Sequence, residues 1–439
     1  MNKRILYGIM IIVLMATGCS SSTEPGSGGG EIINTNGITA EMGSNAVFIP
    51  ESVVESGMTE ADPEAGRYTF SADVLNSGGI DLKPGEILLI AGVGLGRITS
   101  VQQTGGEIQV QTGYASINEA FREADIEWER DFELTDEIIA NSLIEVEGEE
   151  FLAYSVVGGV YQWQISSGSY SGTASIQPKG NSATITVVLT KQEGNTSVGF
   201  RAETTIRQVS NYTNLEIRDH KTRKFAFKNP NMGGDVELRL ASAGGGVDQN
   251  IGIGPLVMLR IPFSIGPIPV VLAVKVRTVA AVSVIGNSSV VAETKFSYSG
   301  SAGLSYDGTT VSTDYDSAIA NPNHQGGSGD LAAIIGLNVN AQWGFAAPEV
   351  ELQMFGNTVV PYLRPEFFLR ANLSWGPVCQ SVTAEYQVKA GLDVRFLGVA
   401  SASIFENNIV PMREWKAFSP QGCADKQMDN QYLYFPAFQ

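Results

Sequence analysis

The sequence predicts an all-β protein, with a small N-terminal β module followed by a large antiparallel β-sandwich or long curved sheet. The clearest pattern is residues 386–396, where apolar residues occupy the even positions from Tyr386 to Phe396 and mostly polar or small residues the odd ones. Such alternation is typical of an antiparallel strand with one buried and one solvated face. At about 3.3 Å per residue this strand would reach roughly 36 Å, well above the usual length. Similar runs recur along the chain between Gly, Asn and Ser turns, which is typical of a sheet protein.

The N-terminal module is predicted from short strands and turns. Strands are expected at residues 67–75, 86–90, 97–101 and 107–112. A Pro84-Gly85 turn precedes the second of these strands, and a Gly105-Gly106 turn precedes the last. Ser116 and Glu119 have the spacing of a capping box, which predicts a short helix near Ala120.

The module resembles a small β module of uncharacterised exported bacterial proteins. The resemblance covers about 50 residues and is carried by Pro84, Gly85, Thr112 and Ala115. It implies no function.

The glycine-rich run at residues 92–96 leads into another strand and not into a helix, so it does not predict a dinucleotide site.

An acidic stretch at residues 119–150 contains 13 Asp and Glu residues but only Arg122 and Arg130 as basic residues. Calcium or a basic partner would be a functional explanation. Calcium loops, however, need carboxylates at D-x-D-x-D spacing, which this stretch lacks. We therefore expect a solvated acidic linker that ends the module.

The main body is predicted to be strand after strand. Shorter strands are expected at residues 183–189, 197–206, 215–217 and 235–240, and longer ones at 270–285, 331–345 and 359–375.

Residues 251–285 are apolar, but four prolines and three basic residues argue against a membrane-spanning helix. Residues 266–269 predict a hairpin or corner. A hairpin packed in the core is the favoured interpretation, and an apolar tip that contacts lipid or a hydrophobic ligand is the alternative.

The N-terminus has the pattern of an export signal. Lys3 and Arg4 precede 14 apolar residues, which is shorter than the ~20 of a membrane span. The segment ends in Ala16-Thr17-Gly18-Cys19, which resembles the lipobox of bacterial lipoproteins, with Ala16 where that family usually has Leu. The resemblance implies cleavage before Cys19 and acylation of Cys19 by palmitate-type chains. The alternative is an ordinary signal peptide with a chance cysteine.

The residues after Cys19 indicate where the anchored chain resides. Residues 20–30 are rich in Gly and Ser, which is typical of a flexible tether. Ser20 stands where lipoproteins retained in the inner membrane often have Asp, so the chain resembles the group sorted to the outer membrane. We expect a lipid-anchored protein of the bacterial cell envelope, held to the outer membrane through the acyl chains on Cys19.

The expected organisation has four parts, namely a signal peptide (1–18), a tether (19–35), the small β module with its short helix and acidic linker (36–150) and the main β domain (151–439). If Cys19 is acylated, Cys379 and Cys423 remain as a pair. Exported proteins form disulfides, so this pair predicts a disulfide that closes a loop of about 45 residues. Two separate buried thiols are the alternative.

Composition excludes several function classes. A formal net charge of -18 is unsuited to nucleic acid, whose phosphates need a basic surface. Two His and three Cys leave little for a metal site or a His-based catalytic centre, so no metal or cofactor is expected.

His220 is expected in a solvated loop, with an anion site as the alternative. His324 is expected in a hairpin connection, with a calcium loop as the alternative.

These observations favour a lipoprotein with a non-enzymatic binding or structural role, whose partner is a polysaccharide, a protein or a hydrophobic ligand. One alternative is a protein that binds lipid or another hydrophobic ligand. The other is a hydrolase acting on glycans, because paired carboxylates could converge in the fold although no pair is marked by the sequence. Four aromatic residues could form a sugar-stacking platform, but aromatic residues in strands more often pack in the core; they are Trp163, Trp343, Trp375 and Tyr386.

Overall fold

The fold is that of a computed structural model, which describes most of the chain from residue 32 to residue 419. The described residues are 32–35, 37–63, 65–140, 142–146, 149–151, 153–167, 170–193, 196–244, 247–249, 253–284, 288–315, 332–335, 339–355, 358–374, 379–392 and 405–419.

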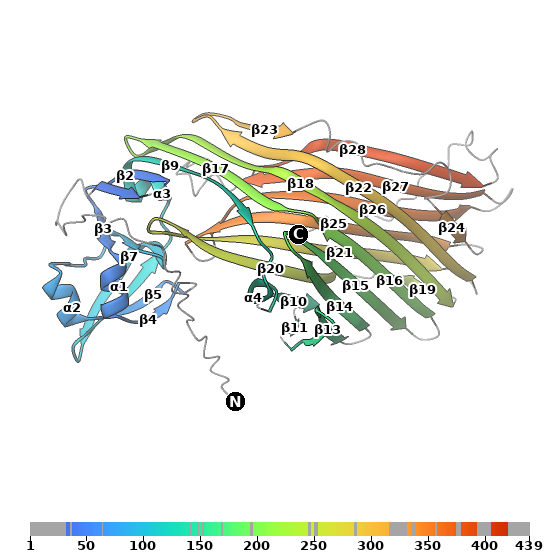
Figure 1. The fold of residues 1–439 in the computed structure, drawn as a ribbon, viewed down its shortest axis with the longest axis horizontal. Coiled ribbons are helices and arrows are strands. Elements are labelled where there is room, and N and C mark those ends of the chain that lie inside the picture. Colours follow the sequence, from blue (N-terminus) through green and yellow to red (C-terminus); the bar gives the residue numbers. More distant parts are fainter. Residues whose placement is uncertain are drawn as a thin grey trace.

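Thirteen antiparallel strands of the described residues form one sheet, called the large sheet here (Figure 1). Its order is β1-β2-β9-β17-β18-β16-β15-β14-β13-β12, and β22 pairs with the other edge of β18 and with β23 and β24. The strands are β1 (Ile32–Thr35), β2 (Ile38–Met42), β9 (Phe121–Phe132), β12 (Ser155–Val157), β13 (Val160–Ser167), β14 (Tyr170–Lys179), β15 (Ser182–Glu193), β16 (Thr196–Ile206), β17 (Val209–Arg218), β18 (Lys221–Gly244), β22 (Ser288–Tyr306), β23 (Val311–Tyr315) and β24 (Ala332–Ile335).

A second antiparallel sheet stacks on the large sheet. Its order is β11-β10-β20-β21-β25-β26-β27-β28, with β19 paired to β21. The strands are β10 (Leu143–Val146), β11 (Glu149–Phe151), β19 (Val247–Gln249), β20 (Ile253–Ile265), β21 (Ile268–Val284), β25 (Val339–Met354), β26 (Thr358–Ser374), β27 (Cys379–Leu392) and β28 (Phe405–Ser419). Strand β22 contacts β25, β26 and β27 without pairing to them, so the sheets meet face to face as a sandwich.

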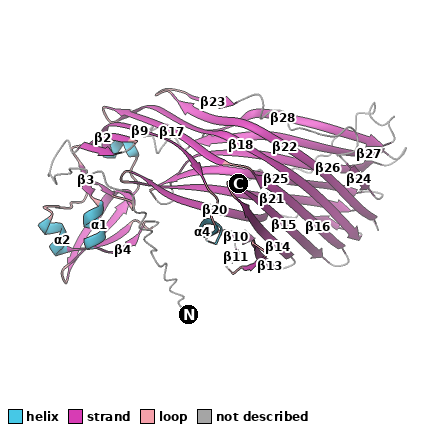
Figure 2. Ribbon diagram, in the orientation of Figure 1, coloured by secondary structure: helices cyan, strands magenta, loops and turns pink. Residues whose placement is uncertain are grey.

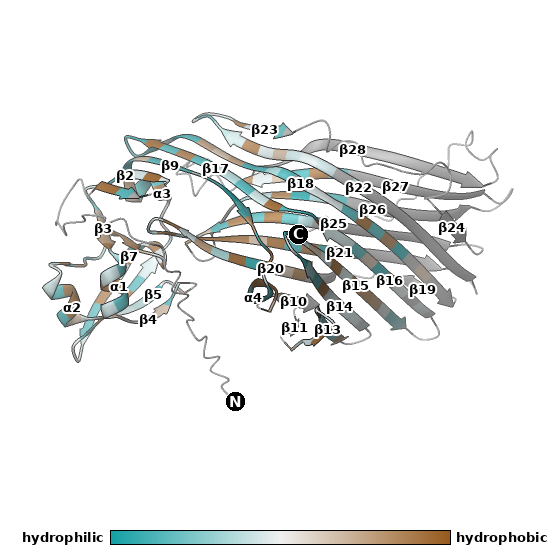
Figure 3. Cartoon of the chain, viewed as in Figure 1, coloured by the Kyte–Doolittle hydropathy of each residue, from teal (hydrophilic) through white to brown (hydrophobic). Residues whose placement is uncertain are grey.

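The core lies between the two sheets. Phe225 and Phe227 of the large sheet and Leu272 and Leu352 of the second sheet are completely buried in it. Each fully buried side chain of this size contributes about 1.5–3 kcal/mol. Figure 3 shows apolar and polar residues alternating along the described strands.

The N-terminal module has its own six-stranded sheet, ordered β3-β6-β7-β8-β5-β4, in which β3 and β6 are parallel (Figure 2). Helices α1 (Glu51–Gly57) and α2 (Ala72–Ser77) cover one face, and α3 (Ile117–Ala120) lies beside β6 and β9. Strand β6 is buried on both faces, because Leu88 and Ile90 pack in the module core while Ile87 and Leu89 pack in the main core. The strands are β3 (Ala46–Ile49), β4 (Met58–Asp62), β5 (Arg67–Ser71), β6 (Ile87–Ile90), β7 (Gly94–Thr104) and β8 (Glu107–Gly113). The predicted all-β class, with a small β module before large antiparallel sheets, is confirmed.

Two predictions for the module had different outcomes. The capping box is confirmed, since the backbone N–H of Ser116 donates to the Glu119 carboxylate at 2.8 Å. The strand expected at residues 67–75 ends at Ser71, and α2 follows. From there the buried residues Ala72 and Leu75 are three positions apart, which is the spacing of a helix and not of a strand.

The acidic stretch expected to be a linker contains β9, which pairs with β2 on one side and β17 on the other. Phe121, Ala124 and Ile126 are buried in the core, while Asp125 and Glu127 are exposed on the outer face. The stretch therefore supplies a strand of the large sheet. The carboxylates of Asp125 and Glu127 in β9 are solvated because they alternate with apolar residues, and not because the segment lacks structure.

The predicted turn at residues 266–269 joins β20 to β21, and at its tip Gly266 is exposed while Pro267 is buried. Ile268 is fully buried, and the backbone N–H of Gly92 in the module donates to the carbonyl of Pro267 at 2.9 Å. The Phe263 ring lies 5.0 Å from Phe132. The hairpin is thus packed, as the core-hairpin interpretation predicted, and its contact with the module was not anticipated from the sequence.

Helix α4 (Asp136–Ala140) contacts β14 and β20. In the part of the chain that the structure describes, no helix is both long enough and apolar enough to cross a membrane.

Candidate functional site

A hollow of about 380 Å³ opens on the outer face of the large sheet, across strands β2, β9, β17 and β18. We call it the outer groove. Its lining is mostly polar and consists of Gly37, Ile38, Thr39, Asp125, Ile126, Glu127, Asn214, Leu215, Glu216 and Lys224.

Strand register brings these residues together. Thr39, Asp125, Glu216 and Lys224 are successive cross-strand partners, and Glu127 pairs with Asn214 in the adjacent row. Cross-strand partners on one face have Cβ atoms about 4.5–5.5 Å apart, so their polar groups act as one surface.

A glycine contributes to the shape of the groove. Gly37 has φ +84, and a Cβ atom there would lie 2.7 Å from the backbone oxygen of Glu127. Only glycine adopts this conformation without strain, and no other residue type would let the chain pass so close to β9.

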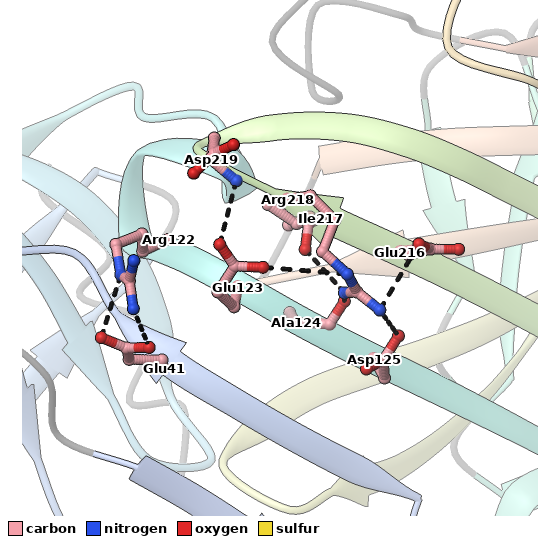
Figure 4. Close-up of polar contacts among 9 residues, drawn as sticks. All are labelled: Glu41, Arg122, Glu123, Ala124, Asp125, Glu216, Ile217, Arg218 and Asp219. Carbon is pink, nitrogen blue, oxygen red and sulfur yellow. Dashed lines mark hydrogen bonds and ion pairs between the residues drawn. The ribbon is translucent and has the colours of Figure 1, made fainter.

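Arg218 holds two of the lining carboxylates (Figure 4). Its guanidinium donates to Asp125 at 2.7 Å and lies 3.4 Å from Glu216. The hydrogen bond to Asp125 raises the pKa of Arg218, so the guanidinium stays charged. Asp125 and Glu216 are thereby partly neutralised, although both side chains stay exposed, at 61% and 37%.

A second ion pair stands beside the groove, between Arg122 of β9 and Glu41 of β2 (Figure 4). Glu123 accepts a hydrogen bond from the backbone N–H of Asp219 at 3.2 Å and lies 3.7 Å from Arg218. These contacts tie β2, β9 and β17 together at the end where the module joins the body.

Tyr212 positions the third carboxylate. Its hydroxyl donates to Glu127 at 2.9 Å. Burial and this hydrogen bond raise the pKa of Tyr212, so the hydroxyl keeps its proton. The groove therefore presents carboxylates, an amide, a hydroxyl and an ammonium in a preset arrangement, which suits hydrogen bonding to a ligand.

The described residues show no cluster of three or more His, Cys, Asp or Glu side chains that could hold a metal ion. The contacts to Arg218 also occupy Asp125 and Glu216. The arrangement provides no basis for assigning a metal to the groove.

A buried network of charges lies on the face of the second sheet that points away from the apolar core. Lys275 Nζ lies 2.6 Å from Glu351. Arg277 contacts both carboxylate oxygens of Glu349, at 3.1 and 3.2 Å. Arg364 lies 2.9 Å from Glu366, which is 0% exposed.

The two carboxyl groups on β25 have opposite pKa shifts. Burial raises the pKa of Glu349, and its hydrogen bond with Glu351 acts in the same direction. Burial opposes the charge on Glu351 as well, but the hydrogen bond from Glu349 and the Lys275 ammonium hold the pKa of Glu351 below its ordinary value. Glu349 is 1% exposed and Glu351 5%, so this network is enclosed within the protein.

His220, expected in a solvated loop, lies in the two-residue turn between β17 and β18. Asp219 and His220 have φ of 51 and 57, the left-handed conformation that such tight hairpin turns require. His220 Nδ1 is 3.1 Å from the carbonyl oxygen of Asn118, so the turn contacts α3. The neighbouring Arg218 is engaged by carboxylates, and the alternative of an anion site at this turn gains no support.

The other candidate residues are placed as follows. Trp163 is fully buried in the core, as the core interpretation predicted. Trp343 and Tyr386 belong to β25 and β27, and Cys379 is the first residue of β27. Four further residues lie outside the described residues, namely Cys19, His324, Trp375 and Cys423. Acylation of Cys19 and the Cys379–Cys423 disulfide therefore stay predictions.

The groove was missed by sequence reasoning, although one signal for it was present. In residues 121–132, acidic side chains alternate with Ala124 and Ile126, and this alternation marks a strand with an acidic outer face.

No family model, curated protein or solved structure matches the chain.

Proposed function

We propose that the chain is a lipid-anchored protein of the bacterial cell envelope, attached to the outer membrane, with a non-enzymatic binding role centred on the outer groove. The observation that carries the proposal is the N-terminal pattern, in which Cys19 follows a short apolar segment and precedes a Gly/Ser-rich tether. Two or more acyl chains give stable attachment, since each buried CH₂ contributes about 0.8 kcal/mol.

The groove supports binding as the role of the body. It is open on the outer face of the large sheet, and Arg218 and Tyr212 donate hydrogen bonds to two of its carboxylates. The support for binding comes from the hollow and its polar lining, since exposed contacts of this kind restrain a side chain only weakly.

The two alternatives have less support. A hydrophobic ligand would need an apolar cavity or an exposed apolar tip, whereas the β20–β21 tip is packed against the module and large side chains occupy the described core. A glycan hydrolase would need an accessible pair of carboxyl groups free for acid and base roles, whereas Glu349 and Glu351 are enclosed and, in the open groove, Asp125 and Glu216 are both ion-paired with Arg218.

The anchor can be tested by growing a bacterial host that expresses the full chain with an alkyne-labelled fatty acid. The wild-type chain should carry the label in the membrane fraction, and Cys19→Ala should lack it. Cys379→Ala is the matched control and should label like the wild type. A wild-type chain without label would overturn the proposal.

A further inference from the structure

We propose that two copies of this chain associate through strand β12, which pairs edge to edge with the same strand of the second copy across a two-fold axis. The large sheets of the two copies then continue into each other at this edge. The contact is separate from the outer groove, so the proposal goes beyond the binding role described above.

Strand β12 is the last strand of the large sheet at this edge and is exposed along its whole length. It pairs with β13, and its other edge pairs with no strand in the described part of the chain. Val156 is 53% exposed, Val157 68% and the preceding Tyr154 39%. The Tyr154 ring lies 5.5 Å from both Tyr161 and Trp163 of β13. Three of the five exposed large hydrophobic residues among the described ones are therefore gathered at this edge.

The edge lacks the charges that keep exposed strands apart. An unpaired edge strand is a template for another strand, and proteins often protect such edges with charged residues or proline. Residues 151–178 contain no charged residue, which is the longest such run in the chain, and they include β12, β13 and most of β14. By contrast β11, which ends the second sheet, carries Glu149 and Glu150. Because β12 has only 3 residues, we expect a small interface and a weak dimer.

The turn after β12 determines which backbone groups are free to pair. Gly158 and Gly159 both have positive φ, of 59 and 78, and form a two-residue turn between the paired residues Val157 and Val160. The pair that flanks such a turn exchanges hydrogen bonds, and bonded pairs alternate along an antiparallel ladder. The N–H and C=O of Val156 therefore point away from β13, toward the second copy.

Pairing about Val156 brings uncharged residues together. With Val156 opposite Val156 of the second copy, Ser155 lies opposite Val157 and Tyr154 opposite Gly158 of the other strand. Directly opposite residues on one face have Cβ atoms about 4.5–5.5 Å apart, so the two Val156 side chains shield each other from water. The contact therefore buries apolar side chains that are exposed in the single chain.

The charges favour a second copy as the partner. The formal net charge of -18 makes two copies repel each other wherever their acidic faces meet. The charge-free run is where they can approach with the least repulsion, whereas a basic partner would be attracted to the acidic faces instead. Pairing across a two-fold axis uses the same strand twice, so this chain supplies both halves of the contact.

The test is sedimentation equilibrium of the full chain in density-matched detergent micelles over a range of concentrations. Val156→Lys places like charges opposite each other across the two-fold axis. Val156→Pro removes the N–H that faces the second copy and leaves the hydrogen bonds to β13. Ile32→Lys is the matched control, because Ile32 is 64% exposed on β1, at the opposite end of the strand order in the same sheet. Thermal unfolding verifies that each variant is folded.

A cysteine at the centre of the contact tests the register. The Cα atoms of a hydrogen-bonded antiparallel pair lie about 5.5 Å apart, which is within the range of a disulfide. Mild oxidation should therefore join two Val156→Cys chains into a covalent dimer on a gel without reductant. The wild type and Ile32→Cys, treated in the same way, should not form this product.

We expect a reversible equilibrium between monomer and dimer, weakened at least about tenfold by Val156→Lys or Val156→Pro and unchanged by Ile32→Lys. A chain that stays monomeric at every concentration overturns the proposal, and so does a dimer that both Val156 variants leave intact. A dimer in which Val156→Cys forms no cross-link overturns the two-fold register. Fatty-acid labelling at Cys19 is unaffected by all of these outcomes, so failure of the dimer is distinguishable from failure of the anchor.

Discussion

Replacement of Glu366 by glutamine should destabilise the protein strongly. Glu366 is 0% exposed, and one of its carboxylate oxygens lies 2.9 Å from Arg364 Nε and 3.4 Å from Lys389 Nζ. Gln387 donates to the other oxygen. The amide of glutamine keeps the shape of the side chain but removes its charge, so two largely buried cations lose a negative neighbour.

The expected magnitude follows from burial. Removing one partner of a buried ion pair costs about 3–5 kcal/mol, because the remaining charge is left in a poorly solvated site. The Glu203–Arg201 pair supplies the contrast, since its side chains are 34% and 46% exposed. Exposed pairs are worth about 0–1 kcal/mol, so Glu203→Gln should change little.

Equilibrium unfolding of the full chain in guanidinium chloride, followed by tryptophan fluorescence, measures the difference. Glu366→Gln should lower the unfolding midpoint with the slope unchanged, while Glu203→Gln should match the wild type. Equal midpoints for the two variants would refute the reasoning, because they would mean that Glu366 is as well solvated as a surface carboxylate.

Four further predictions concern the packing, the buried charges and the cysteines. Phe263→Ala should lower the free energy of unfolding by about 1.5–3 kcal/mol, because its ring is partly buried and packs 5.0 Å from Phe132; a loss below about 0.5 kcal/mol in the same assay would contradict the packing of the β20–β21 hairpin on β9. Burial raises the pKa of Glu349 above its ordinary 4.5, so the folded protein keeps a proton that the unfolded chain releases; stability should therefore fall as the pH rises above that value, and thermal unfolding of Glu349→Gln should show a flatter dependence. The pKa of Glu351 is lowered instead, so its contribution should be lost as the pH falls below 4.5. Peptide mapping without reductant should find Cys379 joined to Cys423, and reduction should cost about 3–4 kcal/mol; two free thiols would contradict this prediction.

Much of the fold was predictable because strand patterns are local. The alternation from Tyr386 onward predicted β27 as far as Leu392, where the described part of that strand ends, with Val388 and Ala390 buried as expected. The other face was expected to be solvated, but Lys389 on that face belongs to the enclosed charge network and its side chain is only 16% exposed. The strands expected at residues 183–189 and 197–206 lie within β15 and β16. The capping box at Ser116 and Glu119 is equally local, since four neighbouring residues contain all of its groups.

One local pattern was interpreted wrongly, and other features were beyond local reasoning. The acidic residues of β9 suggested a linker because charge was given more weight than alternation. The outer groove joins Thr39, Asp125, Glu216 and Lys224 through strand register, which no short segment specifies. The same holds for Arg277 and Glu349, which are 72 residues apart in the chain.

The sequence by itself determined the class of fold, the turns that separate the strands, and the N-terminal pattern that predicts a lipid anchor at Cys19. Each of these depends on neighbouring residues, whose period and polarity act on the backbone directly. Only the tertiary structure decided which strands pair, and therefore which carboxylates face an open groove and which are enclosed with arginine and lysine. Solvation and distance set the behaviour of a charged group, and both arise only when distant segments are brought together.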